Sequence, residues 1–146
     1  MKRLDRVGII LAIALASSTD ASAQISWPLG PQNQVHKIWG TYGQFCGDHF
    51  HEGLDLPADS GTAVLAVQNG EIVQLKNIGT PYFRYLSVGI DPNPFPTAWG
   101  YLHMNIANHP TQPRSWQVGD AVATGDTLGT ITTRAGIMAH LHFEYA

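Results

Sequence analysis

The sequence predicts an all-β fold of short antiparallel strands. From Leu54 onward, short runs of β-branched and aromatic residues alternate with clusters of Gly, Pro, Asn and Asp. No amphipathic helix of useful length follows residue 23. Two Gly-Asp turns, Val118-Gly119-Asp120 and Thr124-Gly125-Asp126, repeat six residues apart and predict one β-turn-β element.

Seven strands are expected between these turn signals. Asn69-Gly70 favours a tight hairpin between the strands on either side of it. The segment 91–96 contains three prolines, which remove ladder donors, so it is expected to form a loop. The expected strands are Ala63–Val67, Glu71–Lys76, Tyr82–Ile90, Ala98–His103, Ala121–Ala123, Thr127–Thr132 and His140–Tyr145.

Residues 1–23 have the pattern of a secretory signal peptide. Three positive charges precede an apolar run at 7–16, which is shorter than the roughly 20 residues that span a bilayer. Ala21-Ser22-Ala23 is a small-residue cleavage pattern, so the mature chain is expected to start at Gln24. We therefore expect export to the periplasm or the medium, with no membrane span after cleavage.

The remaining chain divides into an irregular lead-in, residues 24–48, and one domain, residues 49–146, which we expect to be monomeric. The whole chain has 8 Lys and Arg against 11 Asp and Glu, and the basic residues after residue 23 are scattered. This distribution lacks the basic stripe of nucleic-acid-binding proteins. The one cysteine, Cys46, cannot form an intramolecular disulfide and is expected to be a small buried apolar side chain.

Histidines and one aspartate form a candidate metal site. His51 and Asp55 are four residues apart, and His140 and His142 are two apart. Two imidazoles and one carboxylate are typical of catalytic zinc sites, which leave the fourth position for water. Zinc lowers the pKa of that water to roughly 7. A nearby imidazole can then act as a base and accept a proton from the water.

The spacing of His51 and Asp55 requires a bend. On a straight strand these residues would lie roughly 13 Å apart, too far to share an ion. Gly53 lies between them and would let the chain bend. A helix of the His-Glu-x-x-His type, with Glu52 as the base, is the alternative, but Gly53 and Pro57 oppose it.

The second histidine pair fits a strand. His140 and His142 would share one face about 7 Å apart, while Leu141 and Phe143 point into the core. One imidazole could bind the metal and the other could transfer a proton. His103 ends an aromatic strand and could stabilise negative charge on the reaction intermediate. Tyr101 could either line a groove or pack in the core.

Several motifs in order resemble the lysostaphin/LytM-type zinc endopeptidases. The resemblance starts at His51-Glu52-Gly53-Leu54-Asp55 and continues through Tyr101-Leu102-His103-Met104. It continues with the Gly-Asp hairpin from Val118 to Thr130 and ends at His140-Leu141-His142-Phe143-Glu144. It covers roughly residues 45–145.

This resemblance implies a duplicated hybrid motif, a barrel-sandwich of antiparallel strands. It implies one Zn²⁺ per chain bound by His51, Asp55 and His142, with His140 at the base position and His103 as its partner. The implied function is hydrolysis of peptidoglycan cross-links or stem peptides. A non-catalytic regulatory or wall-binding module on the same fold is the alternative. Ala139 stands where the family commonly has Pro, in a loop that lines the cleft.

Overall fold

A computed structural model describes residues 25–77, 84–90 and 97–145, so the predicted signal peptide lies outside the described residues. Because the described residues form no helix, none of them provides one that could cross a membrane. They form nine strands. The strands are β1 (Leu54–Pro57), β2 (Ala63–Leu65), β3 (Gly70–Asn77), β4 (Arg84–Gly89), β5 (Ala98–Leu102), β6 (Met104–Ile106), β7 (Ala121–Val122), β8 (Thr127–Ile131) and β9 (His140–Tyr145).

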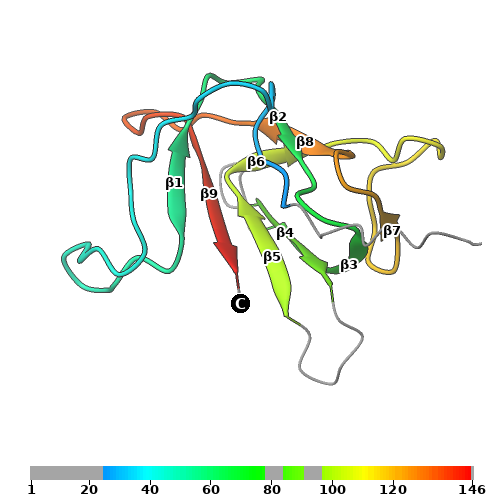
Figure 1. The fold of residues 1–146 in the computed structure, drawn as a ribbon, viewed down its shortest axis with the longest axis horizontal. Helices are drawn as coiled ribbons and strands as arrows, with labels where there is room; N and C mark the ends of the chain where they lie inside the picture. Colours follow the sequence, from blue (N-terminus) through cyan, green and yellow to red (C-terminus); the bar gives the residue numbers. More distant parts are fainter. Residues whose placement is uncertain (1–24, 78–83, 91–96, 146) are drawn as a thin grey trace, which may run out of the picture.

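The strands form two sheets, as Figure 1 shows. The larger sheet has the order β1-β9-β5-β4-β3-β7, and the smaller has the order β2-β8-β6. Every strand pair is antiparallel. The predicted all-β fold of antiparallel strands is therefore confirmed.

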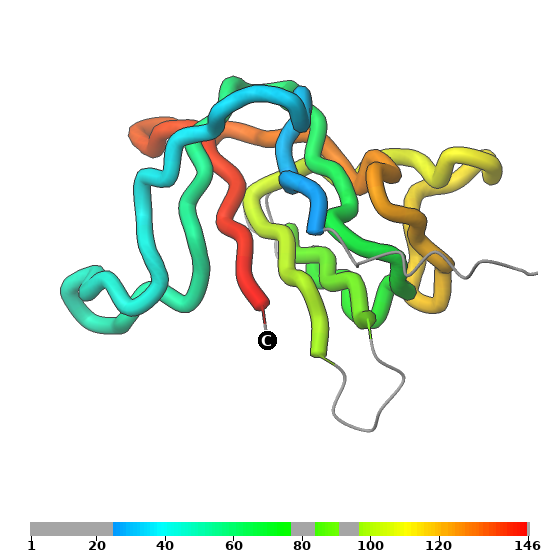
Figure 2. The backbone as a smooth tube through the Cα atoms, viewed as in Figure 1, coloured from blue at the N-terminus to red at the C-terminus, as the bar shows by residue number. Residues whose placement is uncertain are grey.

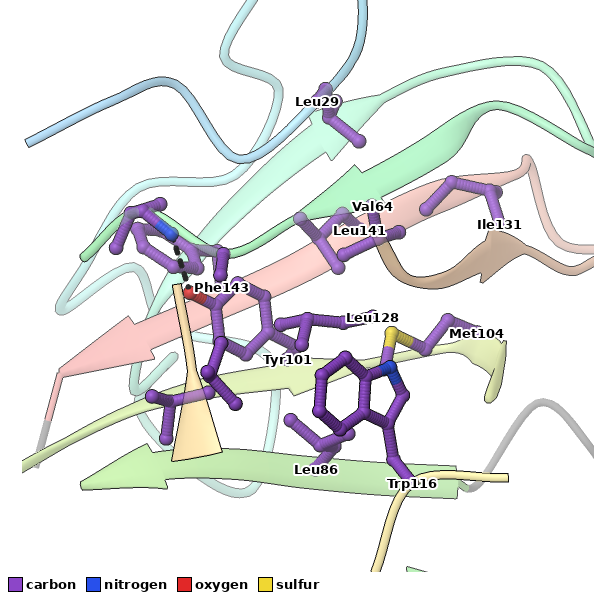
Figure 3. Close-up of a cluster of buried hydrophobic side chains, with 14 of the residues drawn as sticks. Leu29, Val64, Leu86, Tyr101, Met104, Trp116, Leu128, Ile131, Leu141 and Phe143 are labelled. Atoms are coloured by element: carbon purple, nitrogen blue, oxygen red, sulfur yellow. Dashed lines mark hydrogen bonds between the residues drawn. The ribbon is translucent and has the colours of Figure 1, made fainter. Parts of the chain in front are cut away.

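The core consists of apolar side chains that the two sheets and the lead-in enclose (Figure 3). In β9 the side chains alternate as predicted: Leu141 and Phe143 are buried in the core, and His140 and His142 lie on the opposite face. Burial of the apolar face fixes the register of β9, because a slip of one residue would place the histidines in the core. Residues of the core cluster include Leu29, Leu56, Val64, Ile72, Leu86, Val88, Met104, Trp116, Leu128 and Ile131.

Tyr101 is a core residue and does not line a groove. Its side chain is 0 % exposed, and its hydroxyl accepts a hydrogen bond of 3.1 Å from the Val67 N–H. Figure 3 draws this bond as a dashed line. Burial raises the pKa of the Tyr101 phenol, and the Val67 hydrogen bond only partly offsets the increase. The hydroxyl therefore stays neutral and satisfies a buried backbone donor.

The lead-in covers an edge of each sheet. Leu29 forms a bridge with Val64 of β2, and Gly40 forms a bridge with Asp55 of β1. Figure 2 shows this segment running from the smaller sheet over one end of the molecule and down beside β1. Backbone groups of both edge strands thus find partners within the chain.

Two details of the sequence prediction are wrong and one is confirmed. Asn69-Gly70 does not form a hairpin, because β2 pairs with β8 and β3 pairs with β4 and β7. The Asn69 side chain instead accepts a hydrogen bond of 2.8 Å from the Thr124 N–H. Strands β1 and β6 were not expected. Both Gly-Asp turns are present, since the Asp120 and Asp126 carboxylates accept backbone N–H groups three residues earlier.

We expect Tyr101→Phe to lower the free energy of unfolding by about 1–3 kcal/mol, because it leaves the buried Val67 N–H without an acceptor. Chemical denaturation of the mature protein measures this difference. Tyr145→Phe is the matched control, since its side chain is 53 % exposed, and should change stability by less than about 0.5 kcal/mol. Equal stability of Tyr101→Phe and the parent protein would contradict this account of the core.

Candidate metal centre

Three potential metal ligands converge where β1 pairs with β9. Asp55 lies directly opposite His142 in the antiparallel ladder, which places both side chains on one face. His51 Nε2 lies 2.9 Å from His142 Nδ1. Asp55 Oδ1 lies 3.1 Å from each of these nitrogens. These atoms form a nearly regular triangle that could hold one metal ion.

The lead-in and a bend bring His51 to this position. The His51 N–H donates to the Gln44 carbonyl, and the His51 carbonyl accepts from the Gly43 N–H, both at 2.8 Å. The bend predicted at Gly53 is present, but Gly53 does not have a positive φ. A Cβ there would lie 2.5 Å from the Phe143 carbonyl oxygen and 2.9 Å from His142 Nε2. Gly53 is therefore required for space, not for a left-handed backbone.

The hydrogen-bond partners of the two rings direct their lone pairs toward one point. His51 Nδ1 lies 3.0 Å from the Thr41 carbonyl oxygen, which can only accept, so the neutral ring carries its proton on Nδ1. His142 Nε2 faces the Glu144 carboxylate at 3.4 Å, which assigns the proton of that ring to Nε2. The remaining nitrogens and the Asp55 carboxylate oxygen are all acceptors. Three acceptors in mutual contact repel one another, so this donor set fits a bound cation.

The charges of the site shift two pKa values in opposite directions. Burial raises the pKa of Asp55, but the His142 hydrogen bond and three nearby imidazoles outweigh burial and lower it. Burial lowers the pKa of His142, but the Asp55 hydrogen bond and the charges of Asp55 and Glu144 outweigh burial and raise it. Asp55 is therefore ionised at neutral pH, and a proton on His142 competes with a metal ion.

His140 and His103 lie beside the three converging side chains. His140 is 5 % exposed, its Nδ1–H donates to the Met138 carbonyl at 2.8 Å, and its Nε2 lies 3.7 Å from Asp55 Oδ1. The His103 ring centroid is 4.8 Å from that of His140 and 6.1 Å from that of His142. The structure therefore brings together all five residues predicted from the sequence.

The sequence predicted that His103 would be the last residue of its strand, and this prediction is wrong. The strand ends at Leu102, and His103 has a φ of 68° between β5 of the larger sheet and β6 of the smaller. A left-handed backbone costs a non-glycine residue about 1–2 kcal/mol. Two backbone hydrogen bonds, to the Arg84 carbonyl and from the Thr132 N–H, hold this conformation.

A cleft of about 620 Å³ extends from the converging histidines across the larger sheet. Its floor includes a row of residues that lie opposite one another on four successive strands: His142, Leu102, Tyr85 and Lys76. Neighbouring strands are about 4.8 Å apart, so Lys76 lies about 14 Å from His142. This length accommodates roughly four residues of an extended peptide.

We compared the chain with models of known protein families. The family model described as Peptidase family M23 matches residues 49–146. The chain belongs to peptidase family M23. The resemblance to lysostaphin-type peptidases found in the sequence motifs is thus confirmed. No curated protein matches the chain.

Solved structures of M23 proteins share the fold of this chain. The catalytic domain of the prophage-encoded protein EnpA from Enterococcus faecalis is 20% identical, with 84% of this chain and 86% of that chain covered and a TM-score of 0.61. LytU is 27% identical, with 77% and 74% covered and a TM-score of 0.56. The antimicrobial peptidase lysostaphin from Staphylococcus simulans is 24% identical, with 75% and 43% covered and a TM-score of 0.58. The match spans less than half of the lysostaphin chain.

Sequence reasoning missed the groups that orient the rings in this M23 chain. Two of them, the Thr41 and Met138 carbonyls, are backbone atoms and leave no signal in residue types. Gly40 was also missed, although a Cβ there would lie 2.6 Å from Asp55 Oδ2. Glu144 stood beside the His-x-His pattern, and its two-residue spacing on a strand was a usable signal.

The prediction for Cys46, near the site, is wrong, whereas the prediction for Glu52 agrees with the structure. Cys46 is exposed, not buried, because it lies in a short hairpin of the lead-in that the bridge between Phe45 and Phe50 closes. The expectation of a buried apolar side chain is therefore wrong. Glu52 is exposed at the rim of the cleft, and residues 51–53 are not helical, which agrees with the rejection of the His-Glu-x-x-His design.

We expect the affinity of this M23 chain for Zn²⁺ to fall as the pH falls. His142 has a raised pKa and must lose its proton to bind metal, so each pH unit below that pKa should weaken binding up to about tenfold. The lowered pKa of Asp55 keeps this carboxylate ionised over the same range. Competition with a chromogenic chelator between about pH 5 and about pH 8 measures the effect. Constant affinity across this range would contradict binding through the histidines.

Proposed function

We propose that this chain is a zinc-dependent endopeptidase that hydrolyses peptide bonds in peptidoglycan cross-links or stem peptides. One observation carries the proposal: three acceptor atoms converge at the end of a cleft, and a second pair of histidines lies beside them. Membership of a peptidase family supports hydrolysis. The peptidoglycan substrate is supported by the motifs that the chain shares with lysostaphin-type enzymes.

His51, Asp55 and His142 would hold the zinc ion, one per chain. Two nitrogens and one carboxylate oxygen suit zinc, and three protein ligands leave a fourth position open. When bound there, zinc would supply a Lewis acid that polarises the substrate carbonyl and lowers the pKa of water.

His140 is proposed as the proton-transfer residue. Because the Met138 carbonyl holds the proton on Nδ1, Nε2 of His140 is unprotonated and would accept a proton from the attacking water. His140 then delivers this proton from Nε2 to the leaving amine. His103, beside His140, would donate a hydrogen bond to the oxygen on which negative charge develops. The cleft floor from Leu102 to Lys76 would hold the peptide on one side of the scissile bond.

We also propose that residues 1–23 direct export and that the mature protein acts as a monomer in the periplasm or the medium. The charged start, apolar run and cleavage pattern support export. Mass spectrometry of the secreted protein and its size on gel filtration would test these two proposals. An N-terminus at Gln24 and a monomer elution volume are expected.

We expect His140→Ala to reduce the release of cross-linked muropeptides by about 10²–10⁴-fold and to retain one zinc per chain, because His140 transfers protons and does not bind the metal. His142→Ala should lose both activity and zinc. Mass spectrometry of muropeptide digests and metal analysis measure the two effects separately. His109→Ala is the matched control, because its ring packs on Trp116 away from the cleft.

Two results would contradict the proposal. Zinc-loaded parent protein that cleaves no wall peptide of any type would exclude the endopeptidase function. A cellular function that survives His142→Ala would favour the alternative of a non-catalytic regulatory or wall-binding module.

A further inference from the structure

We propose that Glu144 is a positioning residue for the metal site, which fixes the proton and the ring orientation of His142 from the side opposite the metal. This inference rests on the proposed function in one respect, namely that His142 binds zinc. Two further residues support Glu144: the phenol of Tyr85 contacts it, and the absence of a side chain at Gly100 leaves space for it.

The first step of the argument is the location of the Glu144 carboxylate. Glu144 follows His142 by two residues on β9, so both side chains stand on the cleft face of the sheet. Their side chains are only 17 % and 13 % exposed, respectively. One carboxylate oxygen, Oε2, lies 3.4 Å from His142 Nε2. A mostly buried carboxylate requires polar partners, and the His142 ring supplies one.

The second step is the support of the carboxylate from β4. The Tyr85 hydroxyl forms hydrogen bonds with Glu144 and with Ser87, and it donates to the carboxylate. Burial, together with the Glu144 charge, raises the pKa of Tyr85, so the phenol keeps its proton. Glu144 therefore has one partner on each side, an imidazole on β9 and a phenol on β4.

The third step explains the glycine between these strands. Gly100 of β5 lies opposite Glu144 on one side and Ser87 on the other. A Cβ at Gly100 would lie 2.6 Å from Glu144 Cγ, 2.8 Å from Glu144 Oε1 and 2.9 Å from the Tyr85 hydroxyl. The carboxylate and the phenol thus occupy the space that any side chain at residue 100 would fill.

The consequence is a defined tautomer of His142. An acceptor at Nε2 keeps the ring proton there and leaves the Nδ1 lone pair directed at His51 Nε2 and Asp55 Oδ1. A negatively charged acceptor also makes the opposite nitrogen a stronger ligand. Without Glu144, the neutral ring could place its proton on Nδ1 and lose the metal-binding lone pair. The His51 ring has the same arrangement, with the Thr41 carbonyl in the role of Glu144.

The test is the zinc affinity of the mature protein, measured by chelator competition at one pH. We expect Glu144→Ala to bind zinc about 10–100-fold more weakly. Glu144→Gln should lose less than about tenfold, because its amide oxygen still accepts from His142 Nε2–H but carries no charge. Tyr85→Phe should lose less than Glu144→Ala. Visible spectra of the Co²⁺-substituted proteins should change most for Glu144→Ala, since they report on ligand geometry.

Glu52→Gln is the matched control, because Glu52 lines the same cleft and has an exposed side chain. It removes the same charge without removing a partner of His142, so its zinc affinity should stay within about twofold of the parent protein. Thermal unfolding of the metal-free proteins checks that each variant folds. If Glu144→Ala does not fold, Glu144→Gln and Tyr85→Phe must both bind zinc more weakly than Glu52→Gln.

Failure of the positioning role and failure of the proposed endopeptidase function would give different results. Zinc affinity of Glu144→Ala equal to that of Glu52→Gln would overturn the positioning role, even if the protein is an active peptidase. A parent protein that binds zinc and shows these differences but cleaves no wall peptide would overturn only the proposed endopeptidase function. A parent protein that binds no zinc would overturn both.

Discussion

The pairing of β1 with β9 is the constraint on which the site depends. This ladder places Asp55 opposite His142, and the lead-in bridge at Gly40 holds the other side of β1. The buried side chains of β9 fix its register, so the packing of the core also determines where the histidines lie. The polar atoms that converge there repel one another in the absence of a cation. The fold therefore stabilises an arrangement that favours metal binding.

Around the converging atoms, three of the four imidazoles have an acceptor on the side away from the site. His51 uses the Thr41 carbonyl, His140 the Met138 carbonyl and His142 the Glu144 carboxylate. These contacts leave one nitrogen of each ring unprotonated and directed inward, which two ligands and one base require. Only His142 has a charged acceptor. The pKa of His142 is raised, so a proton on this ring competes with a metal ion as the pH falls.

Much of this account could be predicted from residue types and their spacing. Alternation in β9 predicted which side chains are buried, and the ordered motifs predicted the family and the five residues that the fold brings together. The errors have physical causes. Asn69-Gly70 has the composition of a hairpin turn, but tertiary pairing of β2 with β8 overrides it. Cys46 is exposed because hairpin geometry, not hydrophobicity, places it. The carbonyls of Thr41 and Met138 could not be predicted, since every residue has one.

The most direct test of the central claim is a crystal structure of the zinc-loaded protein with anomalous data collected at the zinc edge. The account predicts one anomalous peak per chain, bonded to His51 Nε2, Asp55 Oδ1 and His142 Nδ1 at roughly 2.0–2.2 Å, with a fourth position not filled by the protein. A peak bound through other atoms, such as His140 Nε2 or the Cys46 thiolate, or no peak at all, would contradict it.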